Sequence, residues 1–198
     1  MNNDVIYECV VSTVNEQGQP NVAPLGVRYR PEGRVVLMPF KPSTTLNNIL
    51  ATGHAALNIV TDTRVFAGCI TGRKTWPMLP MVQAPGLRLA CAQRHLELQL
   101  EEVSDDAQRP VLRFTTLRDE THAPFKGYNR AQAAVVEGAV LVSRLHMLPA
   151  DKVDSEMAYL QIAISKTASV AEHEAWGWLL DAIAAHRSKQ GQVAPHRA

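Results

Sequence analysis

The spacing of the apolar residues changes part-way along the chain, and this change constrains the fold more than any other feature of the sequence. Up to about residue 121, short apolar runs are separated by turn signals such as "NEQGQP" and "RPEG". Short strands separated by turns are typical of a barrel or a sandwich. From residue 129 onward, the apolar residues recur at the spacing of amphipathic helices. The sequence therefore predicts a mainly β half followed by about three helices.

Within the first half, apolar runs predict the strands, and only 43–52 is predicted to be helical. The predicted strands are 5–14, 21–29, 34–40, 55–60, 64–70, 95–103 and 110–118. The segment 95–103, "HLELQLEEV", alternates apolar and polar residues, as a strand with one buried face does. We expect no internal repeat, because no segment of the chain resembles another.

A long proline-rich connection, residues 72–92, lies between two of the predicted strands. Loops of this length without structure of their own are uncommon and often functional. The interpretation that we favour is a segment that covers the barrel or an interface. The residues expected to make this cover are Trp76, Met78, Leu79 and Met81.

The second half carries start signals for three helices. The predicted helices are 129–147, 149–165 and 169–187. Asn129 is a suitable N-cap, and Ser169 with Glu172 three residues later forms a capping box. The expected domains are a barrel domain, 1–122, a helical subdomain, 123–190, and a disordered tail, 191–198.

Composition excludes several classes of function. The net charge of +1 in 198 residues signals no nucleic-acid or anionic-membrane surface. No apolar run approaches the ~20 residues that span a bilayer, and the N-terminus lacks the features of a signal peptide. We therefore expect a cytoplasmic protein.

The cysteines and histidines give no sign of a disulfide framework or of a metal centre. Cys9, Cys69 and Cys91 are far apart, so we expect three small buried hydrophobic side chains. The seven histidines follow no spacing of metal ligands, and no metal site is expected, although distant residues can converge in space.

The stretch "FKPSTTLNNILATGHAALNIV", residues 40–60, contains an unusual helix start. With Ser43 as the N-cap and Gly53 as the stop, the first turn carries threonines but no acidic residue, and Lys41 lies just upstream. The unpaired N–H groups and partial positive charge of such a turn favour an external anion such as phosphate. The alternative is an ordinary cap with tolerated threonines.

The strand "NVAPLGV" is interrupted by Pro24 and Gly26, and Pro39 and Pro42 flank the next strand end. Proline cannot donate to a sheet, and an interior glycine often marks the close approach of a ligand to the backbone. The alternative is an edge strand with a bulge.

Taken in order, these motifs resemble the FMN-binding split-barrel superfamily, which includes flavin reductase-like proteins. The nearer resemblance is to its branch catalogued as domain of unknown function 447. It extends from "YECVVSTVNEQGQPNVAPLGV" through "FKGYNRAQAAVVEGAVLVSRLHML" to "ISKTASVAEHEA", where Ala168 and Ser169 replace the usual glycines. The resemblance implies a split β-barrel followed by a small helical subdomain.

The resemblance also implies a cofactor site for FMN. Ser43, Thr44 and Thr45 would hold the phosphate with help from Lys41, and Asn48 and Asn58 would be secondary polar contacts. The backbone that would line the flavin belongs to Pro24, Leu25, Gly26 and Val27. As alternatives, Asn48 would face solvent and Asn58 would tie neighbouring loops together.

By the same resemblance, the protein would be an oxidoreductase that takes electrons from NAD(P)H, and a homodimer with FMN at the subunit interface. Flavin supplies the redox chemistry, so no catalytic triad is required. The alternatives are a non-catalytic flavin carrier or sensor, a protein that binds another phosphorylated ligand, and a link to pterin-dependent one-carbon metabolism. Arg130 and Arg144 would pair with acidic residues, which we favour, or line the site.

Overall fold

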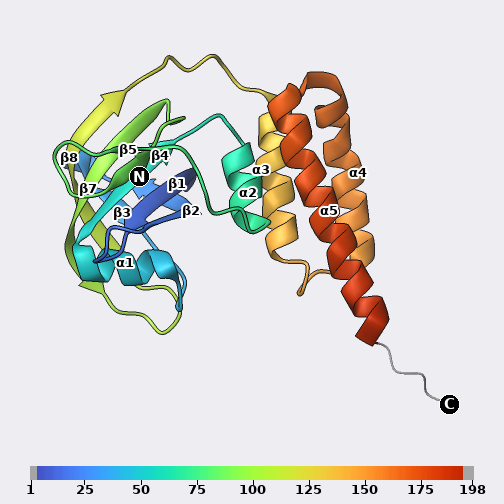
Figure 1. Ribbon diagram of the computed structural model, residues 1–198, viewed down its shortest axis with the longest axis horizontal. Coiled ribbons are helices and arrows are strands. Elements are labelled where there is room, and N and C mark those ends of the chain that lie inside the picture. The colour runs from blue at the N-terminus through green and yellow to red at the C-terminus, as the bar shows by residue number, and fades with distance from the viewer. Residues whose placement is uncertain (1–3, 194–198) are drawn as a thin grey trace. The chain divides into compact units, whose positions relative to one another are not determined.

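The computed structural model describes the backbone of residues 4–193 and the side chains of residues 4–189, and these residues form two compact units. The barrel unit comprises residues 4–61 and 74–125, and the helical unit comprises residues 62–73 and 126–193 (Figure 1). Residues 62–73 thus belong with the helices, although the sequence assigned them to the barrel domain.

Six strands of the described chain close into an antiparallel barrel in the order β1-β2-β3-β8-β7-β4. They are β1 (Tyr7–Val14), β2 (Pro20–Tyr29), β3 (Val35–Leu37), β4 (His54–Ile59), β7 (Arg94–Ser104) and β8 (Val111–Thr121). A 3-10 turn (Pro31–Gly33) joins β2 to β3, and α1 (Thr44–Thr52) joins β3 to β4. The predicted strands at these places are confirmed.

The barrel interior is filled by apolar side chains from alternate strand positions and from one face of α1. Phe114, Leu57 and Leu98 are fully buried there, and Ile49 of α1 packs against the same cluster. Each such side chain contributes about 1.5–3 kcal/mol when it leaves water. Cys9 belongs to this core as expected, whereas Cys69 is only half-buried and Cys91 is exposed, so the expectation of three buried cysteines is wrong.

The proline-rich connection forms a hairpin of β5 (Met78–Pro80) and β6 (Leu87–Leu89) that packs on β1 and β4. Ser12 Oγ donates to Leu87 O at 2.7 Å, and Leu89 N donates to Asn58 Oδ1 at 2.9 Å. Leu89 and Ala84 are the buried residues of this hairpin, whereas Leu79 is 42% exposed. The cover interpretation is confirmed, but different residues anchor the cover.

The helical unit consists of α2 (Arg64–Ile70), α3 (Arg130–Ser143), α4 (Ala150–Thr167) and α5 (Val170–Val193). Asn129 Oδ1 accepts from Ala131 N at 2.8 Å, and Glu172 Oε2 accepts from Ser169 N at 2.8 Å, so both predicted caps are confirmed. Helix α5 continues through residues 191–193, which were expected in the tail, and residues 194–198 lie outside the described part of the chain. No described helix has the length and apolar character needed to cross a membrane.

The prediction of a strand at 64–70 is wrong, because this segment is helix α2. Asp62 starts the helix: its backbone oxygen accepts from Val65 N at 3.2 Å, and its carboxylate accepts from Arg64 N at 3.2 Å. Ala67 is buried in the same core cluster as residues of α3, α4 and α5. A short apolar run suits a strand or a helix equally, and packing against helices decides this one.

Two glycines of the helical unit provide a matched test of its packing. A Cβ on Gly138 of α3 would lie 2.9 Å from Trp176 Cζ3 and 3.1 Å from Leu179 Cδ1, whereas a Cβ on Gly177 of α5 meets nothing within 4 Å. We expect Gly138→Ala to lower the free energy of unfolding by about 1–3 kcal/mol through overpacking. Gly177→Ala should raise it by about 0.5–1 kcal/mol, since alanine is the better helix former.

Urea unfolding, followed by the helical circular dichroism signal, measures both changes. Equal effects of the two substitutions would contradict the close packing of α3 against α5.

Candidate functional site

The first turn of α1 has the unusual start that the sequence predicted. Ser43 Oγ accepts from Leu46 N at 3.2 Å, Gly53 ends the helix with φ 74°, and the first turn contains no acidic residue. Among the described residues, the backbone N–H groups of Thr44 and Thr45 have no hydrogen-bond acceptor. These two donors and the helix dipole give the turn the properties of an anion site.

Thr45 is the residue that ties this turn to the barrel. Its side chain is 3% exposed, and its Oγ1 accepts from Asn21 Nδ2 of β2 at 3.0 Å. Because that hydroxyl oxygen is the acceptor, its own hydrogen remains available to donate. Asn21 was not singled out from the sequence, and no local signal marks it, since the contact spans 24 residues.

Lys41 lies beside the same turn but has a partner already. Its Nζ forms an ion pair with Asp105, and this hydrogen bond holds the pKa of that carboxyl below its usual range. The Asp105 side chain is 83% exposed, so water screens the pair and Lys41 can turn to another anion at little cost.

The interrupted strand β2 has a free edge next to α1. All of residues 20–27 pair with β1, but only Val27, Arg28 and Tyr29 pair with β3. Pro24, Leu25 and Gly26 therefore lie where one edge of the strand has no neighbouring strand. The alternative of an edge strand with a bulge is therefore right about the edge but wrong about the bulge, because the pairing with β1 is continuous.

A side chain at Gly26 would clash with another residue of the chain. A Cβ there would lie 2.6 Å from Ile6 Cγ2, so the close approach on this side is made by the chain itself.

The two candidate asparagines are both buried and both bonded to the protein. Asn48 Nδ2 donates to Thr13 Oγ1 at 3.0 Å, so the interpretation that Asn48 faces solvent is wrong. Asn58 Nδ2 donates to Val10 O at 3.1 Å and to Ser12 Oγ at 3.0 Å, while its Oδ1 accepts from the hairpin. Asn58 therefore ties neighbouring segments together, as the alternative interpretation expected.

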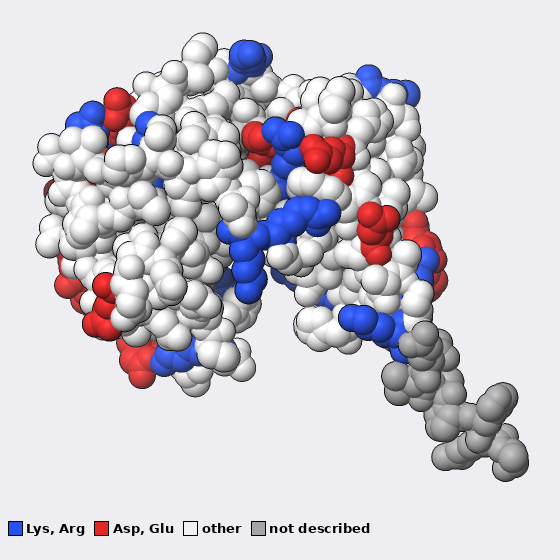
Figure 2. All heavy atoms as spheres, in the orientation of Figure 1, with Lys and Arg blue, Asp and Glu red and all other residues white. Residues whose placement is uncertain are grey.

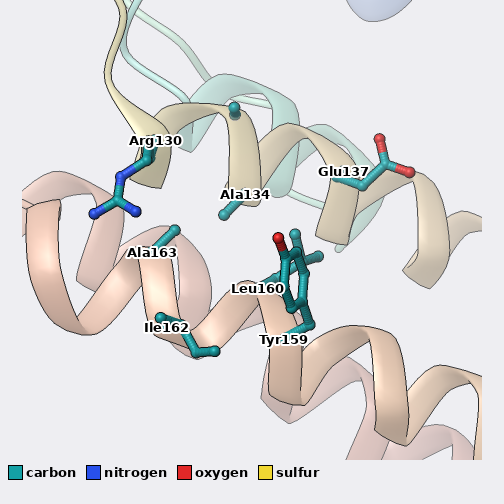
Figure 3. A pocket seen from close by; sticks show the side chains of 8 residues that line it. Arg130, Ala134, Glu137, Tyr159, Leu160, Ile162 and Ala163 are labelled. Atoms are coloured by element: carbon teal, nitrogen blue, oxygen red, sulfur yellow. The ribbon is translucent and has the colours of Figure 1, made fainter.

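Arg130 and Arg144 lie on the helical unit, and neither forms an ion pair with any described residue, so the favoured pairing with acidic side chains is wrong. Arg130 instead lines an open groove of about 400 Å³ between α3 and α4. Figure 3 shows Glu137 from α3 and Tyr159, Ile162 and Ala163 from α4 around the same groove.

A buried carboxylate that the sequence did not predict lies on β7: Glu97 is 0% exposed. Its two oxygens accept from three successive backbone N–H groups of the hairpin turn, those of Val82 (2.8 Å), Gln83 (2.6 Å) and Ala84 (2.9 Å). Burial raises the pKa of Glu97, but these hydrogen bonds outweigh it and hold the pKa below its usual value. Glu97 is therefore an ionised clamp that holds the turn of the hairpin on the barrel.

Charged side chains of both signs lie on the face of the molecule that Figure 2 shows. Most atoms on this face belong to uncharged residues. This distribution agrees with the net charge of +1 and gives no electrostatic footprint for a polyanion.

Comparisons with known families settle the relationship of the chain. The family model for the N-terminal domain of the proteins of unknown function DUF447 matches residues 7–123, and a second DUF447 model matches residues 129–181. The chain belongs to the DUF447 family. No curated protein matches the sequence.

Solved structures agree with this family and with the fold. The FMN-bound DUF447 protein MM1853 from Methanosarcina mazei is 23% identical, with a TM-score of 0.76 over 89% of this chain and 94% of that one. The 2-nitrobenzoate 2-nitroreductase NbaA from Pseudomonas fluorescens is 19% identical, with a TM-score of 0.52 over 61% of this chain and 68% of its own. The NADH:FAD oxidoreductase SgcE6 from Streptomyces globisporus is 12% identical, with a TM-score of 0.50 over 61% and 73%.

These likenesses confirm the predicted fold class. This DUF447 protein is a split β-barrel followed by a C-terminal set of helices, and the likeness to the two enzymes extends over 61% of the chain.

Proposed function

We propose that this protein binds FMN at the first turn of α1 and along the free edge of β2, and that it is a flavin reductase-like oxidoreductase that uses NAD(P)H. One observation carries the proposal: an anion-binding helix start without an acidic residue lies beside a strand edge with no neighbouring strand. The FMN-bound relative from the same family supports the choice of ligand.

The residues at the helix start fit a phosphate by their chemistry. Thr44 and Thr45 offer two backbone N–H donors, and the Ser43 and Thr45 hydroxyls have hydrogens left to donate because their oxygens already accept. Lys41 adds a positive charge once it leaves the exposed Asp105. A dianionic phosphate would satisfy all of these groups together.

The residues of β2 fit the flat ring of a flavin because one edge of the strand is open and its polar backbone groups face no neighbouring strand. Pro24 and Leu25 lie on the free edge and are only half-buried. We propose that the free edge from Pro24 to Gly26, together with the adjoining residue Val27 where the pairing with β3 begins, positions the ring, and that the free edge supplies backbone hydrogen bonds to it. Asn48 and Asn58 act behind this surface, by holding α1 and the hairpin in place.

The oxidoreductase activity rests on the cofactor rather than on a catalytic group of the chain. Bound FMN supplies the transfer of electrons between a nicotinamide and an acceptor, and the protein supplies binding and orientation. The two structural neighbours that are named as a nitroreductase and as an NADH:FAD oxidoreductase share the barrel on which this activity is proposed.

We further propose a cytoplasmic homodimer. Several large apolar side chains of the barrel unit are exposed, among them Val5, Ile6, Tyr7 and Phe40, and a second copy of the chain would cover such side chains. Light scattering on the purified protein is expected to give twice the mass of the chain, and a monomer at all concentrations would contradict the dimer.

The ligand is tested by adding FMN to the purified, flavin-free protein. We expect one FMN per chain. The complex should show a flavin absorption spectrum, and FMN should be released when the protein is denatured. Riboflavin, which lacks the phosphate, should bind at least roughly tenfold more weakly, because hydrogen bonds to a charged group contribute about 1.5–3 kcal/mol each. A protein that takes up no FMN would overturn the proposal.

Activity is tested separately by following the oxidation of NADH and NADPH by the FMN-loaded protein. Oxidation above the rate of free FMN is expected. Binding of FMN without any such oxidation would leave the cofactor site standing and would overturn the oxidoreductase.

A further inference from the structure

Outside the site described above, a group of potential metal ligands lies where the start of β7 meets the end of β8. His95 of β7 pairs directly with Glu120 of β8, and His122 follows the last residue of that strand. One ligand atom from each of the three side chains lies within 4.8 Å of the others. None of the three belongs to the first turn of α1 or to the free edge of β2.

The two imidazole rings already point at the same space. His95 Nδ1 and His122 Nε2 are 2.9 Å apart, while the ring centroids are 5.0 Å apart and the planes are inclined by only 16°. The nitrogens are thus much closer than the ring centres, so the rings meet through their nitrogen edges. Without an ion, one nitrogen must donate its hydrogen to the other.

The His95 ring is fixed by a carboxylate, as the ring of a metal-ligating histidine usually is. It is 1% exposed, and its other nitrogen, Nε2, lies 3.3 Å from Glu97 Oε1. The ionised Glu97 can only accept, so Nε2 carries the hydrogen and Nδ1 presents its lone pair. A carboxylate behind a histidine is the usual outer partner of a metal ligand.

Glu120 is oriented in a similar way. Arg118 donates to Glu120 Oε2 from Nε at 2.9 Å and from Nη2 at 2.7 Å, which leaves Oε1 for another partner. Glu97, Glu120 and Arg118 are thus charged neighbours of the two histidines, and Arg88 and Asp119 also interact electrostatically with His95.

We propose that His95 Nδ1, His122 Nε2 and Glu120 Oε1 bind a divalent transition-metal ion, and that Zn²⁺ fits these ligands best. Two imidazoles and one carboxylate leave a fourth, solvent-filled position of a tetrahedral ion. Two nitrogens bound to one such ion at about 2.1 Å lie about 3.4 Å apart, so the His122 ring has to turn and its nitrogen has to draw back from His95 by about half an ångström. Its side chain is exposed and follows the strand end, which permits this movement.

The experiment is a titration of the full-length, chelator-treated protein with Zn²⁺, followed by calorimetry, and with Co²⁺, followed by its visible absorption. We expect one ion per chain. His122→Ala removes an exposed ligand without disturbing the core, and it should weaken Zn²⁺ binding by roughly 100-fold. Glu120→Gln should weaken it by at least roughly tenfold.

Two variants serve as controls. His173→Ala removes an exposed histidine of α5, and Cys91→Ser removes the exposed cysteine near the start of β7. Both are expected to bind Zn²⁺ as the wild type does. The proposal is overturned if the wild type binds no stoichiometric Zn²⁺ or Co²⁺, if His122→Ala binds as tightly as the wild type, or if Cys91→Ser is the variant that loses binding.

Discussion

Thr44→Glu is expected to weaken FMN binding by roughly 100-fold or more while the protein stays folded. Thr44 is the first residue of α1 and is exposed, so the new carboxylate would stand where the phosphate is proposed to bind. Two like charges about 4 Å apart repel by about 4 kcal/mol at an effective dielectric constant of about 20. A 100-fold change in affinity corresponds to about 2.7 kcal/mol.

The same substitution should not destabilise the protein, because a negative charge in the first turn interacts favourably with the helix dipole, by about 0.3–1 kcal/mol. This opposition between binding and stability is the signature of an anion site. Thr45 is a poorer position for the test, since its side chain is buried against Asn21 and a glutamate there would bury a charge.

The matched control is Thr44→Gln, which has the length of glutamate without its charge. FMN affinities from fluorescence titration and unfolding temperatures from circular dichroism measure the two effects. We expect Thr44→Gln to bind FMN within about threefold of the wild type. Equal affinities of Thr44→Glu and Thr44→Gln would contradict the phosphate site, even if the wild type binds FMN elsewhere.

Glu97→Gln is expected to lower the free energy of unfolding by about 3–5 kcal/mol. The substitution removes a buried negative charge, while the hydrogen-bond donors that point at this charge stay in place. Three backbone N–H groups of the hairpin turn and His95 Nε2 all point at the two carboxylate oxygens. An amide side chain offers one oxygen and places an NH₂ group against the remaining donors. The hairpin over the barrel should therefore loosen, and protease cleavage within residues 72–92 should become faster.

Glu101→Gln is the control, because Glu101 lies on the same strand but is exposed, and we expect its free energy of unfolding to change by no more than about 0.5 kcal/mol.

The stabilisation that Glu97 contributes is also expected to depend on pH. Since the folded pKa lies below the ordinary 4.5, the stabilising contribution is complete above that value and is lost as the pH falls through the folded pKa. Urea unfolding at neutral pH and near pH 3 should show the difference between wild type and Glu97→Gln shrinking in acid, and a constant difference would contradict the ionised clamp.

Helix starts and stops were predictable from the sequence because their hydrogen bonds are local. Ser43 bonds to Leu46 N, Asn129 to Ala131 N, and Glu172 to Ser169 N, so each cap depends on residues at most three positions apart. The period of the apolar residues likewise predicted a barrel or sandwich followed by helices. The candidate anion turn needed no more than these local rules and the absence of an acidic residue.

Features that depend on distant contacts were missed or misassigned. The run at 64–70 has no period that separates strand from helix, and the burial of Ala67 among the helices decided its structure. In "HLELQLEEV" the alternation of residues predicted an exposed polar face, yet His95 and Glu97 are buried because the hairpin covers that face.

The sequence by itself determined the six barrel strands, the three C-terminal helices, the caps at Ser43, Asn129 and Ser169, and the unusual first turn of α1, because local patterns and neighbouring residues set these. Only the tertiary structure brought Asn21 to Thr45, and Glu97 to the hairpin turn. It also brought His122 to His95, 27 residues apart in the chain. Such contacts follow from strand register and from which segment covers which face, and these are properties of the whole folded chain rather than of any local pattern.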